Sequence, residues 1–177
     1  MFGLRIGLAM AAIVLGVAPS FAFELSSSSV SDGKWDKKYF GDKISGCDGG
    51  NVSPALSWKD APKGTKSFGL TLYDPDAPTG SGWWHWQVWN IPPTATGFDE
   101  GKVPAGPIQG KGDIGRQGYL GPCISPGSGV HHYTFTLYAL KVDKLDIDPN
   151  TASGAFVGYT LNGNALAKAT VTYTFQK

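Results

Sequence analysis

The fold of this chain is set by one stretch, Phe68-Gly69-Leu70-Thr71-Leu72-Tyr73-Asp74-Pro75-Asp76-Ala77-Pro78. Its first six residues alternate and are rich in β-formers, which predicts a strand. Asp74 and Asp76 are two residues apart, so in an extended segment both carboxylates point to the same side. The two prolines prevent the segment from continuing as a central strand. The stretch therefore predicts a strand that ends in two carboxylates at the rim of a sheet.

All three histidines of the chain lie in two short segments further along. His85 stands between tryptophans in residues 84–91, a nearly continuous apolar run that predicts a central strand covered on both faces. His131 and His132 precede Tyr133, which begins an alternating run that predicts another strand. Titratable groups gathered in this way are candidates for a functional site. The alternative is that both segments are loops with ordinary surface histidines.

Other strands are expected on both sides of these segments. Residues 23–34 begin as an edge strand at Phe23 and Leu25 and then become irregular. Residues 55–58 form a short strand, and residues 169–175 form the last one. Residues 94–122 are glycine-rich and irregular. So long an irregular stretch is unusual inside a compact domain and is often functional.

A short helix is expected near the C-terminus, over residues 151–159, with Thr151 as its N-cap. Asn162-Gly163 interrupts it, and residues 164–168 form a further helical turn. The residues expected on one face of the helix are Ala152, Phe156 and Tyr159.

The first residues predict a secretory signal peptide rather than part of the fold. Arg5 gives a positive start, residues 6–17 are apolar, and Ala22 ends a small-x-small cleavage site. The apolar run is shorter than the roughly 20 residues of a membrane span, so no stable membrane anchor is expected. We therefore expect a signal peptide over residues 1–22, a single domain over residues 23–177, and a periplasmic or secreted protein. An uncleaved N-terminal anchor is the alternative.

The charge of the mature chain argues against some partners. Cleavage after Ala22 removes Arg5 from the 15 basic residues and none of the 14 acidic ones, so the remainder is formally neutral. A neutral domain offers no electrostatic basis for binding nucleic acid. With 25 glycines and 12 prolines, the chain has the composition of a loop-rich, mainly β protein.

The two cysteines, Cys47 and Cys123, form an even count in an exported chain. An oxidising compartment favours their pairing as a disulfide. The bridge would close a loop of 76 residues, for which chain entropy predicts a stabilisation of about 4–4.5 kcal/mol.

The residue types of the two histidine segments favour an anion site. Two imidazoles from different loops make a partly cationic seat, and glycine-rich loops add bare backbone N–H groups. Asp74 and Asp76 can orient those imidazoles or receive an ammonium group. A metal held by His85, His131 and an aspartate is possible, but no characteristic ligand spacing supports it, and no cofactor is expected. The aromatic residues that could wall the pocket are Trp83, Trp84, Trp86 and Tyr133.

Four motifs in order carry a resemblance to a known family: residues 51–58 (NVSPALSW), residues 74–78 (DPDAP), His85-Trp86, and Gly121-Pro122-Cys123 followed by residues 131–133. The chain resembles the phosphatidylethanolamine-binding protein (PEBP) family, in its bacterial Raf kinase inhibitor-like (YbhB/YbcL) branch. The likeness runs from about residue 41 to the C-terminus. It implies a mainly β fold, an antiparallel β-sandwich of Greek-key type with one or two short helices near the C-terminus.

The resemblance also implies a small anion pocket at one end of the sandwich. Its residues would be Asp74, His85, His131 and Tyr133, with Asp76 as the second acid of the motif. Gly121 and Pro122 belong to the loop that floors the pocket, and each cysteine lies in a loop of a family motif. The chain departs from the family in two places. His132 stands where an arginine is usual. Animal members carry a tyrosine shortly before the central histidine, where this chain has the shorter residues 79–82 (TGSG), so one wall of the pocket is expected to be missing.

Three functions are compatible with these features. The first is a binding protein, without catalysis, for a small anionic or phosphorylated head group such as phosphoethanolamine. The second is a protein-interaction or inhibitor module, for example of a protease, that grips a partner with the pocket and residues 94–122. The third is an acid/base hydrolase, which would need a nucleophile or an activated water, and Cys123 is the nearby thiol. No oligomeric state follows from the sequence.

Overall fold

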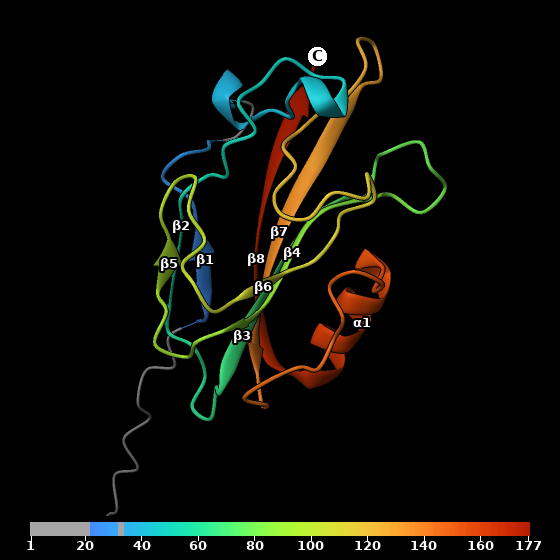
Figure 1. Cartoon of the computed structure of the whole chain (residues 1–177). Helices are drawn as coiled ribbons and strands as arrows, with labels where there is room; N and C mark the ends of the chain where they lie inside the picture. The colour runs from blue at the N-terminus through green and yellow to red at the C-terminus, as the bar shows by residue number, and fades with distance from the viewer. Residues whose placement is uncertain (1–21, 32–33) are drawn as a thin grey trace, which may run out of the picture.

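The computed structural model describes residues 22–31 and 34–177 and shows two antiparallel β-sheets with one α-helix (Figure 1). The predicted signal peptide lies outside the described residues, except for Ala22. Among the described residues, no helix is both long and apolar enough to cross a membrane.

Within the described residues, the larger sheet has five strands and the smaller has three, and each of these strands is paired antiparallel. In sheet order, the larger contains β6 (Ile108–Gln109), β4 (Trp83–Ile91), β3 (Ser67–Asp74), β7 (Val130–Leu140) and β8 (Ala165–Gln176). The smaller contains β1 (Glu24–Ser26), β2 (Leu56–Lys59) and β5 (Gly97–Phe98). The helices are the 3-10 turns η1 (Lys37–Tyr39) and η2 (Lys43–Ser45), and α1 (Gly154–Asn164).

The main core lies between the two sheets. Alternation along β3 places Phe68, Leu70 and Leu72 on the face that meets the smaller sheet, where Trp58 and Phe98 are also buried. The predicted mainly β, antiparallel fold is confirmed. The irregular segment 94–122 supplies β5 to one sheet and β6 to the other, so it connects the layers.

Helix α1 covers the opposite face of the larger sheet (Figure 1). A Cβ on Gly69 of β3 would overlap Leu161 of the helix, so glycine permits this close packing. Trp84 of β4 lies against Gly154 and Gly158, where Cβ atoms would likewise crowd the indole. The prediction that residues 84–91 form a central strand covered on both faces is therefore confirmed.

The predicted C-terminal helix has different bounds and a different buried face. It begins at Gly154 with Ser153 as its N-cap, not Thr151, and it continues through Asn162-Gly163. Phe156 and Tyr159 are exposed, whereas the face toward the sheet consists of Gly154, Val157, Gly158 and Leu161.

One predicted element near the C-terminus is wrong, and one near the start of the domain is confirmed. Residues 165–168 are not a helical turn but the start of β8, where Ala165 pairs with Leu140 of β7. Sheet pairing along the whole of β7 overrides the local helix preference of these alanines and lysine. The edge strand expected at the start of residues 23–34 is confirmed as β1, at one edge of the smaller sheet.

Candidate functional site

A β-bulge positions His85. Leu72 of β3 pairs with Trp86 of β4, and the next residue, Tyr73, pairs with Trp84, so His85 is an extra residue in the strand. A bulge of this kind re-aims the side chain of the extra residue. The His85 ring is buried and faces the cavity described below.

Asp74 and His131 form a buried pair where β3 and β7 end side by side. Alternation along β7 puts His131 and Tyr133 on the core face, the face that also carries Asp74. The Nδ1 atom of His131 lies 2.7 Å from Oδ2 of Asp74, and the two side chains are only 4% and 2% exposed. The other carboxylate oxygen of Asp74 accepts the backbone N–H of Asp76 at 2.9 Å.

These side chains line one cavity of about 380 Å³. A volume of this size is typical of a site for a small molecule. Asp74, His85, His131 and Tyr133 all contribute to its wall, so the structure brings these four predicted residues together. The remaining lining residues are Ser45, Ala77, Pro78, Thr79, Trp83, Ile114, Leu120, Cys123, Ile124, Ser125 and Ser128.

The hydrogen bonds fix which ring nitrogens face the cavity. A carbonyl or carboxylate oxygen only accepts, so Nδ1 of His85 donates to the Leu120 carbonyl at 3.1 Å and Nδ1 of His131 donates to Asp74. Within the described part of the chain, the Nε2 atom of either ring has no protein partner. Both Nε2 atoms are therefore free to bind a ligand.

Burial controls the charge of His85. It lowers the pKa of this imidazole from 6.5 to about 4, and the nearby carboxylate of Asp74 only partly opposes the shift. Near neutral pH the ring is therefore uncharged and its Nε2 is an acceptor. The sequence led us to expect two partly cationic imidazoles, but for His85 that expectation is wrong because desolvation outweighs its neighbour.

Tyr133 supplies a buried hydroxyl group. Burial raises the pKa of this phenol, and the adjacent Asp74 carboxylate raises it further, so the group stays protonated. The hydroxyl makes no hydrogen bond of good geometry to any described residue, although the Asp74 carboxylate and the Cys123 backbone lie close enough to affect its pKa. A buried, unpaired polar group is costly, and a ligand that accepts its proton would remove that cost.

Three predicted site residues lie outside this lining. Asp76 faces outward and accepts hydrogen bonds from the backbone N–H and the ring of His132, each at 2.8 Å. Gly121 is needed for a close approach, because a Cβ there would overlap the carbonyl oxygen of Tyr39. Pro122 accepts the backbone N–H of Gly41, so both residues of this loop support the cavity from behind.

Of the aromatic residues predicted to wall the pocket, some line the cavity and others lie away from it. Trp83 lines the cavity with Tyr133. Trp84 packs on α1, and Trp86 is in the core, where its indole N–H donates to Gln109 at 2.8 Å.

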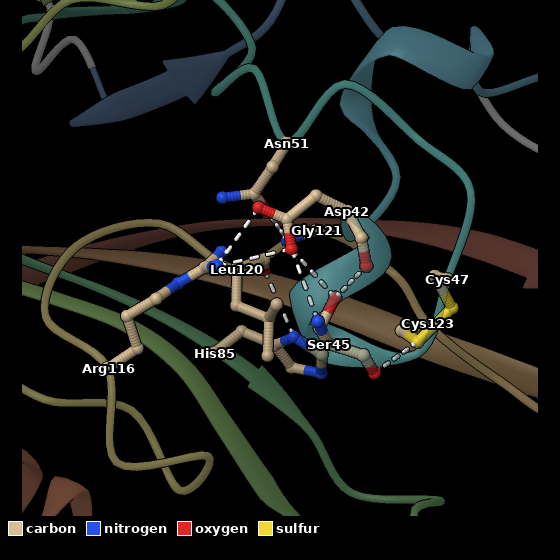
Figure 2. Close-up of a disulfide and its surroundings, with 9 residues drawn as sticks. All are labelled: Asp42, Ser45, Cys47, Asn51, His85, Arg116, Leu120, Gly121 and Cys123. Carbon is tan, nitrogen blue, oxygen red and sulfur yellow. Dashed lines mark hydrogen bonds and ion pairs between the residues drawn. A yellow bond between two sulfur atoms is a disulfide. The ribbon is translucent and has the colours of Figure 1, made fainter.

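The predicted disulfide between Cys47 and Cys123 is present, with the two Cα atoms 5.7 Å apart (Figure 2). It joins the loop after η2 to the cavity wall, because Cys123 is itself a lining residue. Ser45, at the end of η2, lines the cavity on the same side.

An ion pair missed from the sequence reinforces this wall. Arg116 lies 2.9 Å from Asp42, the N-cap of η2 (Figure 2). Partial burial alone would raise the pKa of Asp42, but the guanidinium of Arg116 and the Ser45 N–H outweigh it and leave the pKa below its usual value. Asn51 also bridges the loops, since its side chain bonds the backbone of Tyr119 and Gly121.

The described residues contain no group of three or more histidine, cysteine, aspartate or glutamate side chains placed to hold a metal ion.

The chain is similar in sequence and in structure to known proteins. The profile of a family described as phosphatidylethanolamine-binding protein matches residues 34–176. YbcL of Escherichia coli is 45% identical over 166 residues, which are 90% of this chain and 90% of YbcL. The crystal structure of E. coli YbcL, described as a new member of the mammalian PEBP family, has a TM-score of 0.82 at 44% identity, covering 88% of this chain and 98% of that one.

Two further relatives have different names. E. coli YbhB is 48% identical over 136 residues, or 73% of this chain and 85% of YbhB. LppC of Mycobacterium tuberculosis, whose name marks it as a lipoprotein, is 39% identical over 130 residues, or 73% of this chain and 63% of LppC.

Proposed function

The chain belongs to the phosphatidylethanolamine-binding protein family, and from that premise we propose that its cavity binds a small anionic or phosphorylated head group, with phosphoethanolamine as the simplest example. One observation carries the proposal: the buried Asp74–His131 pair shares a cavity wall with the unpaired hydroxyl of Tyr133.

The polar groups of the cavity favour a ligand that both accepts and donates protons. Tyr133 donates through its hydroxyl, and a protonated His131 donates through Nε2 while Asp74 balances its charge. The neutral His85 offers an acceptor at Nε2. An anion that carries no proton would place its own acceptor oxygens against the Nε2 acceptor of His85, and no hydrogen bond would form between them. A hydrogen phosphate or a phosphoethanolamine supplies the missing donor, so we expect it to bind more tightly than sulfate.

Calorimetric titration with phosphoethanolamine tests the site. We expect His131→Ala to weaken binding by about 1.5–3 kcal/mol, roughly ten- to a hundredfold, the range for a charge-assisted hydrogen bond. His132→Ala is the matched control, because it removes the neighbouring imidazole on the opposite face of β7, and it should change the affinity less than about twofold. Equal losses in the two variants would contradict the proposal.

The affinity should depend on pH. The dianion of a phosphate monoester takes up a proton near pH 6, and that proton can be donated to the neutral Nε2 of His85. We therefore expect phosphoethanolamine to bind more tightly as the pH falls from about 8 to about 6. Sulfate does not titrate in this range, so it is the control. No pH dependence with phosphoethanolamine would contradict this role of His85.

We infer binding rather than catalysis. Cys123 is held in the disulfide and is not available as a nucleophile. Two serine hydroxyls of the cavity wall, those of Ser45 and Ser128, donate hydrogen bonds to backbone carbonyls rather than to an imidazole. A Ser–His or Cys–His pair of the kind that activates a nucleophile is therefore not assembled among the described residues.

We also propose that the protein is exported. The predicted signal peptide, the disulfide and the lipoprotein name of a relative agree with a compartment outside the cytoplasm. N-terminal sequencing of the protein from a periplasmic or culture fraction should begin at Phe23. A retained Met1 in the membrane fraction would contradict cleavage after Ala22.

A further inference from the structure

A second cavity, of about 350 Å³, lies behind the wall of the first. Cys123 and Ile124 line both cavities, so this short segment separates them. The titratable residues of the first cavity, Asp74, His85 and His131, do not reach the second. The second cavity therefore has its own lining chemistry.

Aromatic rings form its apolar walls. The rings of Phe40 and Phe175 have centroids 4.5 Å apart, and both side chains line the cavity with Trp35. The indole N–H of Trp35 donates to the carbonyl of Thr174 at 3.1 Å, which fixes the ring beside β8. The end of β8 thus lies next to the η1–η2 segment, as Figure 1 also shows near the C-terminus.

The rim of this cavity is positively charged. Lys37 and Lys177 line it together with one acid, Asp48, and the Lys37 ammonium lies 2.6 Å from the Asp48 carboxylate. Lys37 lowers the pKa of Asp48 most, and Lys43 and Lys177 lower it further, so three lysines lie within electrostatic reach of this one acid.

From these features we propose that the second cavity binds an amphiphilic anion. Its flat apolar body would lie against Trp35, Phe40 and Phe175, and its charged group would meet Lys37 and Lys177 at the rim. Aromatic walls favour a flat apolar group, and the excess of cations selects the sign of the ligand charge. The cavity volume is within the range of small-molecule sites.

Anilinonaphthalene sulfonate is a suitable probe, because it joins a flat aromatic body to one anionic group. Fluorescence titration of the folded protein should give one site per chain. Saturating phosphoethanolamine and the His131→Ala substitution should leave this site in place, because both act on the first cavity. Backbone amide NMR shifts caused by the probe should appear around Trp35, Phe40 and Phe175.

Substitutions of the basic and the acidic rim residue should change the affinity for the probe in opposite directions. We expect Lys37→Glu to weaken probe binding about threefold and Asp48→Asn, which frees Lys37 from its partner, to strengthen it about twofold, as for exposed charge pairs. Lys63→Glu is the matched control, since this exposed lysine lies in the turn between β2 and β3, away from the cavity. An unchanged near-ultraviolet circular dichroism spectrum establishes that each variant is folded.

Two results would overturn the proposal. One is equal probe affinity in wild type, Lys37→Glu and Asp48→Asn. The other is a set of amide shifts confined to residues around His85 and His131, which would place the probe in the first cavity. Neither result would bear on phosphoethanolamine binding, so the two proposals fail separately.

Discussion

Two Asp–His pairs on the same two segments have nearly the same geometry and opposite surroundings. Asp74 and His131 are 2.7 Å apart, and their side chains are 2% and 4% exposed. Asp76 and His132 are 2.8 Å apart, and theirs are 38% and 50% exposed. The backbone alternation of β7 alone sends one imidazole into the cavity and its neighbour into solvent.

The comparison teaches that distance does not set the worth of such a pair. Water can replace either partner of the outer pair. When one partner of the inner pair is lost, the other is left buried without a hydrogen-bond partner. The inner pair also shares its cavity with His85 and Tyr133, so its environment is what makes it a site. Four changes test this difference, from the largest expected effect to the smallest.

Removing the disulfide should have the largest effect on stability and should also disturb the cavity that holds the inner pair. The bridge closes a loop of 76 residues, so Cys47→Ser with Cys123→Ser should lower the free energy of unfolding by about 4.5 kcal/mol. Because Cys123 belongs to the wall of the first cavity, phosphoethanolamine affinity should fall as well. Urea denaturation and calorimetry measure both quantities. An unchanged affinity in the folded variant would mean that the wall does not depend on the bridge.

Asp74→Ala should come next. It leaves the buried His131 without its partner and frees the backbone N–H of Asp76, so we expect a loss of about 4 kcal/mol in the free energy of unfolding. Urea denaturation at pH 7 measures it. A loss below about 1 kcal/mol would mean that the inner pair is worth no more than the outer one.

Acid should destabilise the protein through His85. Its pKa is about 4 in the folded protein and near 6.5 in the unfolded chain, so unfolding takes up a proton in this range. The neutral ring contributes fully above pH 6.5, and about 3 kcal/mol of that contribution is lost as the pH falls to about 4.

The control for this prediction is His85→Asn, which keeps a donor for the Leu120 carbonyl but does not titrate. Denaturant midpoints from pH 7 to pH 4 should fall less steeply in the variant than in the wild type. Parallel curves would show that His85 is already solvated in the folded protein.

The smallest effect is expected from Asp76→Ala in the outer pair. Partial burial alone would raise the pKa of Asp76, but hydrogen bonds from the ring and backbone N–H of His132 leave it below its usual value. The small stability this represents is present above the ordinary aspartate pKa of about 4 and disappears as the pH falls through the lower folded value. For an exposed pair we expect a loss of about 0.5 kcal/mol at pH 7. Thermal unfolding of Asp76→Ala beside Asp74→Ala gives the comparison directly, and similar losses would refute it.

Much of the fold could be predicted because short-range patterns dictate it. Alternation identified β3 and β7, and the continuous apolar run identified β4 as a strand covered on both faces. The bounds of α1 and the start of β8 were missed because pairing with β7, a tertiary interaction, decides where the helix ends.

For the site, the sequence predicted which residues lie together but not the structural features that position them. The grouping of Asp74, His85, His131 and Tyr133 came from the family motifs, and the structure places all four on one cavity. Their ligand roles remain predictions. The bulge at His85 depends on strand register, and the ion pair between Arg116 and Asp42 joins residues 74 positions apart, so neither has a local signal.

The disulfide also closes a covalent ring, residues 47–123, which one segment precedes and a tail follows. Asp74 and His85 belong to the ring, whereas His131 and Tyr133 belong to the tail. A protease cut in the exposed turn at Lys63 leaves all four of these residues on one fragment, and the disulfide keeps the earlier fragment, with Ser45, attached to it. A cut in the exposed residues 125–128 separates the donors of the tail from the ring, so only non-covalent strand pairing would hold the site together.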